Sequence, residues 1–166
     1  SSHQMKGNAK LTLTPYFYNQ KELFLDAVSF KINNVDVLCK GKSIYSSHNY
    51  DSIRLLILFS KEITKKDTII VNISYIAIPD SAKESNGVAL KENKGLYFIN
   101  TDGSRKNVPM HLWTQGETTS KSHWFPTLDH PSEKHTQTFQ ITIDKNLVSL
   151  SNGKLTKTTL NQDGTK

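Results

Sequence analysis

The chain has 166 residues, a length that suits one globular domain, and its longest unbroken apolar run, residues 55–59, is too short to span a membrane. Hydrophobic residues make up 36% of the chain and charged residues 22%, which is typical of a globular protein and not of a disordered one. The net charge of +6 is spread evenly, which argues against nucleic-acid binding, and the single cysteine, Cys39, excludes an internal disulfide bond.

Period-two alternation of apolar and polar side chains predicts a series of β-strands. In chain order, strands are expected over residues 11–14, 23–27, 30–32, 35–38, 53–59, 69–75, 139–144, 147–150 and 155–160. The run over residues 53–59 is apolar enough to form a central strand. Turns are expected at the Asn-Gly and Asp-Gly pairs, which lie at 86–87, 102–103, 152–153 and 163–164, with a tight hairpin at 152–153.

Signals for helices are weak. No segment keeps a 3.6-residue apolar period for three turns, and the most that the sequence predicts is one helical turn over Pro131–Lys134, capped by Asp129 or His130. The polar stretch 80–94 is expected to be a loop. Residues 1–166 are therefore predicted to form a single all-β domain.

Common catalytic motifs are absent from the sequence, which contains no H-E-x-x-H, no G-x-S-x-G, no P-loop and no G-x-G-x-x-G. His123, His130 and His135 lie near Asp129 in the chain, but their spacing fits no common zinc pattern. Scattered polar histidines in a loop are the favoured interpretation. The sequence therefore predicts neither a catalytic residue nor a metal ligand in this chain.

The most unusual stretch, residues 113–131, holds both tryptophans and shows no strand or helix period. Bulky aromatic side chains in an irregular segment often pin a long loop to the body of a domain, and such loops often carry function. Gln115 and Glu117 are two residues apart, so their side chains share a face wherever the backbone is extended. An amide and a carboxylate that point together suit a cationic amine. The alternative is that both side chains cap loop amides.

Two motifs in this stretch resemble a family signature. Residues 114–117 read T-Q-G-E and residues 124–131 read W-F-P-T-L-D-H-P, which is similar to the T-Q-x-E … F-P-x-x-D-x-P signature of the aminopeptidase N family of zinc metallopeptidases. Residues 94–98 and the S-N-G of residues 151–153 are also similar to parts of that family. The resemblance implies the family's N-terminal β domain, a saddle-shaped antiparallel sheet assembly, present as a fragment truncated at both ends.

The resemblance also implies roles for single residues. Glu117 matches the family's acid that grips the free α-amino group of the substrate, and Gln115 matches the glutamine that lines the pocket for the first side chain. Asp129 matches a position that shapes the loop. Trp124 and Thr127 depart from the residues common in the family, which alters packing and leaves the first two matches untouched.

The zinc ligands, the general-base glutamate and the catalytic tyrosine of the family belong to its next domain. The resemblance therefore implies that this chain alone holds no cofactor and is inactive. For the parent protein we expect zinc, a catalytic domain in the same polypeptide and peptide N-termini as partners, with no nucleic acid and no membrane span. A location in the cell envelope or periplasm of a bacterium follows if the parent carries a signal peptide.

Two other functions stay open on the sequence. A free-standing β-sandwich that serves as a binding or adhesion module would share the fold. A polyanion-binding module would use the net charge of +6, but it needs clustered basic residues interleaved with exposed aromatic residues, which the sequence does not show.

Overall fold

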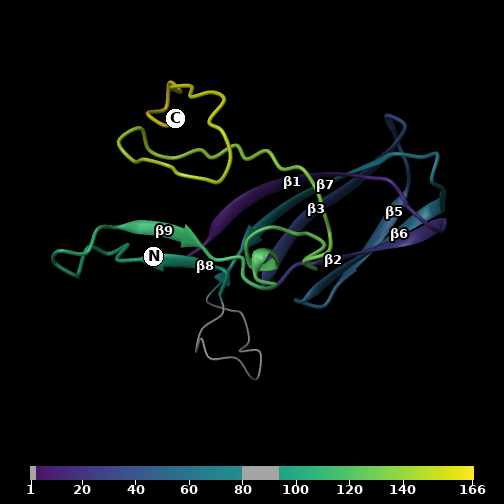
Figure 1. Cartoon of the computed structure of the whole chain (residues 1–166), viewed down its shortest axis with the longest axis horizontal. Helices are drawn as coiled ribbons and strands as arrows, with labels where there is room; N and C mark the ends of the chain where they lie inside the picture. The colour runs from purple at the N-terminus through teal and green to yellow at the C-terminus, as the bar shows by residue number, and fades with distance from the viewer. Residues whose placement is uncertain (1–2, 80–93) are drawn as a thin grey trace. The chain divides into compact units, whose positions relative to one another are not determined.

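The computed structural model describes residues 3–79 and 94–166, and the chain divides into two compact units, Ser1–Glu133 and Lys134–Lys166. All the strands of the described residues belong to the first unit, and all of them pair in antiparallel fashion (Figure 1). The fold is therefore all-β and antiparallel, as predicted. The extent of the domain stays a prediction.

Four strands form one sheet in the order β1-β7-β3-β4, made of β1 (Met5–Leu13), β7 (Ile69–Ala77), β3 (Phe30–Cys39) and β4 (Lys42–Ser43). Along β7 the odd-numbered side chains are buried and the even-numbered ones are half-buried. Since successive side chains of a strand face opposite sides, one face of β7 covers the core. The strands predicted at 30–32 and 35–38 are one strand, β3, because a bulge between Ile32 and Asn34 absorbs the break in alternation.

Three further strands form a second sheet in the order β2-β6-β5, made of β2 (Gln20–Asp26), β6 (Arg54–Ile63) and β5 (Ser46–Tyr50). The apolar run predicted to be central is the middle strand of this sheet. Leu55 and Ile57 on β6 are fully buried. β5 was not predicted, because its sequence S-S-H-N-Y lacks apolar alternation and it lies at the edge of the sheet.

Side chains from both sheets meet in one hydrophobic core, so the two sheets form a sandwich. Its buried members are Leu25, Ala27, Phe30, Val37, Cys39, Leu55, Ile57, Phe59, Ile63, Ile69, Val71, Ile73, Tyr75, Ala77 and Leu96. Full burial of one large aliphatic side chain stabilises the fold by roughly 1.5–3 kcal/mol relative to exposure. Apolar packing therefore dominates the stability of the sandwich.

A two-stranded sheet leads into the stretch that carries the family motifs. β8 (Leu96–Ile99) pairs with β9 (His111–Thr114), and Tyr97 stacks on Trp113 with ring centroids 4.7 Å apart. The connection contains the turn predicted at residues 102–103, where Gly103 has a φ of +68° and donates its N–H to Asn100 O at 3.1 Å. β9 was not predicted, and Trp113 lies on a strand instead of in an irregular segment.

The second unit contains no regular strand between residues 134 and 166. The predictions that prove wrong are the strands at 139–144, 147–150 and 155–160 and the hairpin at 152–153. All of their apolar side chains except the half-buried Ile143 are exposed, for example Val148 at 90% and Leu150 at 96%. A period-two pattern selects which side chains would face a core, but a strand also needs a neighbour that bonds its backbone. Here an isolated antiparallel bridge forms between Asp144 and Thr165.

The sequence allows at most one helical turn over Pro131–Lys134, and none forms there. The Glu133 N–H donates to His130 O at 3.0 Å, which closes a four-residue turn. A helix would repeat such a bond along successive residues. A 3-10 helical turn lies instead at η2 (Lys121–His123).

Two predictions concern residues that the structure does not describe. The loop expected over residues 80–94 and the turn at 86–87 lie outside the described residues, except for Lys94. Among the residues that are described, no helix is long and apolar enough to cross a lipid bilayer.

Candidate functional site

The two residues predicted to recognise an amine follow β9 directly. The Gln115 N–H donates to Gly95 O at 2.9 Å, so the pairing between β8 and β9 continues one residue beyond the strand. The Gln115 side chain is half-buried, whereas Glu117 is exposed and begins a turn over residues 117–120. The expectation that both side chains share one face stays a prediction.

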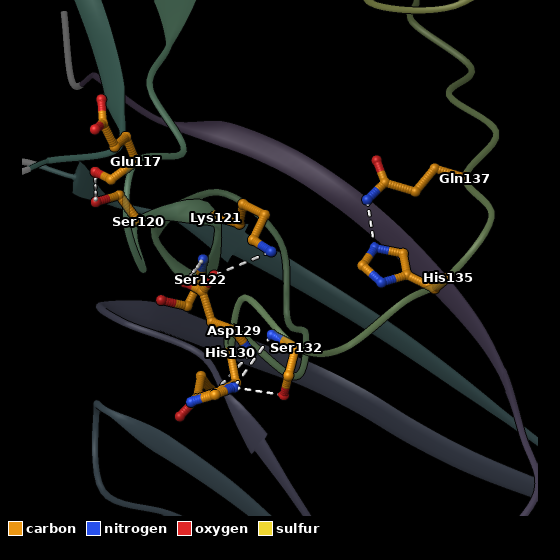
Figure 2. Close-up of polar contacts among 10 residues, drawn as sticks. Glu117, Ser120, Lys121, Ser122, Asp129, His130, Ser132, His135 and Gln137 are labelled. Atoms are coloured by element: carbon orange, nitrogen blue, oxygen red, sulfur yellow. Dashed lines mark hydrogen bonds and ion pairs between the residues drawn. The ribbon is translucent and has the colours of Figure 1, made fainter.

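Hydrogen bonds fix the backbone of Glu117, whereas its carboxylate has no partner among residues 3–79 and 94–166. The hydroxyl of the buried Ser120 donates to the Glu117 carbonyl oxygen at 3.2 Å, and the Ser120 N–H donates to Gly116 O at 3.3 Å. Figure 2 shows the Glu117 carboxylate directed away from Ser120 and Lys121. No residue that the structure describes gives this carboxylate a hydrogen bond or an ion pair. Within those residues Glu117 therefore does not cap a loop amide, which was the alternative interpretation.

Asp129 holds the helical turn that follows Glu117 (Figure 2). Its side chain is buried, its Oδ2 accepts the Ser122 N–H at 2.8 Å, and its Oδ1 lies 3.6 Å from Nζ of Lys121. The Asp129 N–H donates to Oδ2 of Asp26, at the end of β2, at 3.0 Å. A buried carboxylate is costly unless it is paired, so these contacts favour one conformation of residues 115–131, which are called the segment below.

Hydrogen bonds also attach the segment to both sheets of the sandwich. Asp26 and Thr127 exchange two backbone bonds at 2.8 and 3.0 Å, which adds a short bridge beside β2. The Tyr75 hydroxyl on β7 donates to Trp124 O at 2.9 Å. Burial raises the pKa of this hydroxyl, which keeps it protonated as a donor.

Apolar packing secures the same segment. The side chains that pack on the core are Trp124, Phe125 and Leu128, and Pro126 between them is fully buried. The prediction that aromatic residues pin this loop is therefore confirmed for Trp124. Trp113 differs, because it stands on β9 and is 42% exposed.

Gly95 allows β8 to approach the turn that holds Glu117. Its φ is +61°, and a Cβ atom added there would lie 2.2 Å from the Ser120 carbonyl oxygen and 2.7 Å from Cβ of His123. Neither a backbone oxygen nor a Cβ can yield as the far end of a flexible side chain does. Both the positive φ and the close approach therefore require glycine at this position.

The three histidines singled out in the sequence make separate local contacts. Burial lowers the pKa of His123, because the charged imidazole is the form that is harder to remove from water. His130 Nδ1 lies 2.7 Å from Ser132 Oγ, and His135 is hydrogen-bonded to Gln137 (Figure 2). Within the described ranges, no three His, Cys, Asp or Glu side chains gather in a way that could hold a metal ion.

Asp129 could be named from the sequence, but the residues that hold its side chain and its backbone N–H could not. Asp26 is 103 residues away in the chain, and Lys121 and Ser122 fall between the two motifs. The only feature of the sequence that pointed to Asp26 was its place as a carboxylate at the end of an alternating strand. That feature does not identify a partner.

The fold and the motifs agree with a known family. The family model of the peptidase M1 N-terminal domain matches residues 1–166. The chain belongs to this family, and the resemblance seen in the sequence is confirmed.

Solved structures share this fold. The M1 zinc metallopeptidase of Deinococcus radiodurans matches with a TM-score of 0.54 and 14% identity, over 78% of this chain and 26% of that chain. A mutant of that metallopeptidase, bound to a Tyr-Ser-Ala substrate, matches with a TM-score of 0.56 and 13% identity over the same shares. The chain thus spans about a quarter of the length of these structures.

The chain is also similar in sequence to a protein that is not named as a peptidase. The transcription initiation factor TFIID subunit 2 of Gallus gallus is 35% identical over 71 residues, which are 42% of this chain and 6% of that protein. The matched part is therefore a small fraction of that relative.

Proposed function

We propose that this chain is the non-catalytic N-terminal domain of a zinc aminopeptidase, in which Glu117 binds the free α-amino group of the peptide substrate. One observation carries the proposal: the Glu117 carboxylate is exposed and unpaired among the described residues, while Ser120 fixes its backbone. Membership in the M1 N-terminal domain family supports it.

The chemistry of the substrate explains why a carboxylate suits this task. An enzyme that cleaves from the N-terminus must distinguish a chain end from a chain interior, and the protonated amine marks that end. A carboxylate binds this charge directly, and the hydrogen bond strengthens as water is excluded. In this proposal the Gln115 amide, which both donates and accepts, lines the pocket for the first side chain.

The proposal assigns catalysis to a second domain of the same polypeptide. Zinc held there would polarise the scissile carbonyl and activate water. The task of the present chain would be to position the amine so that the first peptide bond meets that centre. The Tyr-Ser-Ala substrate bound to an M1 metallopeptidase of this fold is consistent with a peptide ligand.

The test is hydrolysis of free-amine aminoacyl substrates by the full-length protein. Glu117→Ala should lower kcat/KM by on the order of 10–10³-fold, because removal of one partner of a desolvated charge pair costs roughly 2–5 kcal/mol. Glu117→Gln should lose less, since it keeps an acceptor for the amine. Gln115→Ala should instead change which first residue is preferred, with a smaller mean loss.

Glu133→Ala is the matched control, because Glu133 is also exposed but lies outside the turn over residues 117–120. Substrates with an acetylated amine add a second control. They should be poor substrates for the parent protein, and Glu117→Ala should change their hydrolysis little. If Glu117→Ala cleaved free-amine substrates as well as the parent does, the anchoring role would be wrong.

A free-standing binding module is the second candidate function. It is favoured by the similarity to a relative that is named as a transcription initiation factor subunit and not as a peptidase. The reading frame beyond residue 166 separates the two candidates. A further domain with H-E-x-x-H supports the aminopeptidase, and a frame that stops near residue 166 without that motif supports the free-standing module.

A further inference from the structure

Three connections of the sandwich leave its two sheets at the same end (Figure 1). They follow β1, β3 and β6, and they comprise residues 14–19, 40–41 and 64–68. The register of the larger sheet shows the shared end, because Leu13 of β1 and Cys39 of β3 both pair with Ile69, the first residue of β7. These three connections are named the loop end.

Side-chain and backbone contacts join the three connections to one another. The hydroxyls of Thr14 and Thr68 lie 3.3 Å apart, and the Lys40 N–H donates to Thr68 O at 3.3 Å. Nζ of Lys40 lies 2.8 Å from Oδ1 of Asp67. Asp67 also accepts the N–H and the hydroxyl of Thr64, at 2.9 and 2.7 Å. The loop end is therefore one connected surface.

Three consecutive aromatic side chains protrude from the loop end. Tyr16, Phe17 and Tyr18 are 83%, 77% and 80% exposed. Their rings contact one another, with Tyr16 and Phe17 edge to face at 4.6 Å, and none of them joins the hydrophobic core. Burial of these rings would stabilise the fold, so their shared exposure indicates a role outside the folded chain.

Positive charge accompanies these aromatic residues. The exposed lysines of the loop end are Lys65, Lys66 and Lys40, of which Lys40 pairs with Asp67, the single acid of the loop end. These basic and aromatic residues are not clustered in the sequence, because they come from connections far apart in the chain. The fold brings them to one end of the sandwich.

We propose that the loop end docks on the surface of an anionic lipid membrane. The ring of Phe17 would enter the boundary between headgroups and acyl chains. The rings of Tyr16 and Tyr18 would lie beside it at the level of the lipid headgroups, where amphipathic aromatic side chains are enriched. The lysines would face the lipid phosphates, each adding a modest and salt-sensitive attraction. This inference is independent of the proposed aminopeptidase role.

A lipid surface fits these observations better than a folded partner or a nucleic acid does. A folded partner would have to supply a pocket for each protruding ring, whereas a fluid bilayer adapts to them. Nucleic-acid bases also stack on exposed ring faces, so binding of a single-stranded nucleic acid is one outcome of the test below. The combination of one phenylalanine, two tyrosines and flanking lysines is typical of an interfacial contact.

The test is co-sedimentation of the whole protein with vesicles of phosphatidylcholine, either alone or mixed with phosphatidylglycerol. We expect binding to the mixed vesicles that weakens as salt is added. Lys65→Glu combined with Lys66→Glu should reduce vesicle affinity by about tenfold or more, because two attractions become repulsions. Phe17→Ser should reduce it by about fivefold or more, since it removes the apolar ring that enters the bilayer.

Matched controls lie toward the other end of the sandwich. Lys6→Glu combined with Lys31→Glu makes the same charge change at two exposed lysines that both pair with Ile76. Ile53→Ser removes an apolar side chain that is 58% exposed, just before β6. Both controls should bind mixed vesicles more strongly than the loop-end variants do, and circular dichroism should show that all variants fold.

Three outcomes would overturn the proposal. Equal binding to both kinds of vesicle, or no binding to either, would remove the anionic membrane as the partner. Equal losses in the loop-end variants and their controls would show that the loop end is not the contact. Binding of an oligothymidylate that is lost in the loop-end variants, without vesicle binding, would assign the surface to nucleic acid.

Discussion

The β-sandwich and the segment over residues 115–131 are both held firmly, but by different interactions. In the sandwich, alternate apolar side chains meet in one core while the strands pair their backbones in regular ladders. In the segment, the buried residues include Ser120, Ser122, Thr127 and Asp129. Irregular backbone has no ladder, so each N–H and C=O group needs its own partner. Polar side chains at a few positions therefore bond backbone groups of the segment, as strand pairing bonds the backbone groups of the sandwich.

The largest expected effect lies on the sandwich side of this comparison. Leu55 is fully buried on the central strand β6. Leu55→Ala should lower the free energy of unfolding by about 2–5 kcal/mol, because it removes buried methyl groups and leaves a cavity. Urea denaturation measures this value. Leu58→Ala on the same strand is the control, since Leu58 is 42% exposed, and an equal loss there would contradict the assignment of the core face.

An intermediate effect is expected in the segment. Asp129→Ala leaves the Ser122 N–H without its acceptor and Lys121 without its ion pair, which should cost about 1–3 kcal/mol. The loss should be local, so amide exchange of Ser122 should accelerate more than that of β6. Asp36→Ala, at an exposed aspartate, is the control. Uniform acceleration across both regions would show that the segment and the sandwich unfold as one unit.

The smallest effect is a dependence of stability on pH through His123. Burial lowers its pKa in the folded chain below the ordinary value of 6.5, so the unfolded chain takes up a proton first as the pH falls. Its contribution to stability is therefore complete above that value and is lost as the pH falls toward the lowered folded pKa. Unfolding curves between about pH 7 and pH 5 should be flatter for His123→Gln than for the parent. An equal or steeper slope for His123→Gln would contradict the assignment.

The central strands could be predicted because apolar and polar side chains alternate along their own sequences. β6 and β7 carry apolar side chains at every second position or nearly so, and both lie in the middle of their sheets. The edge strands β4 and β5 are short and polar, so their pairing depends on the neighbouring strand and not on their own pattern.

The same reasoning fails for residues 134–166. Phe139 and Ile141 alternate as clearly as residues of β7, yet they are 40% and 48% exposed. Alternation states which side chains a sheet would bury, but it does not supply the strand that must lie alongside. The absence of a regular partner among the described residues decides the outcome there.

The candidate site shows the same division between local and distant information. Gln115 and Glu117 could be named as candidates because they lie in a short motif that resembles a family signature. The contact between Asp26 and Asp129 could not be predicted, since 103 residues separate them and the sequence around each residue does not identify its partner. Spatial neighbours of this kind become visible only when the strands are in place.

Gly95 limits how the sequence of this domain can drift or be redesigned. A methyl group there would displace the Ser120 carbonyl, and Ser120 also bonds the Glu117 backbone, so a substitution at residue 95 reaches the candidate amine ligand indirectly. Gly103 shares a positive φ but would place its Cβ in open space, so an asparagine, which tolerates that φ, is acceptable there. In a redesign of the β8–β9 hairpin, Gly103 at the tip can therefore be replaced, whereas Gly95 at the base must be kept.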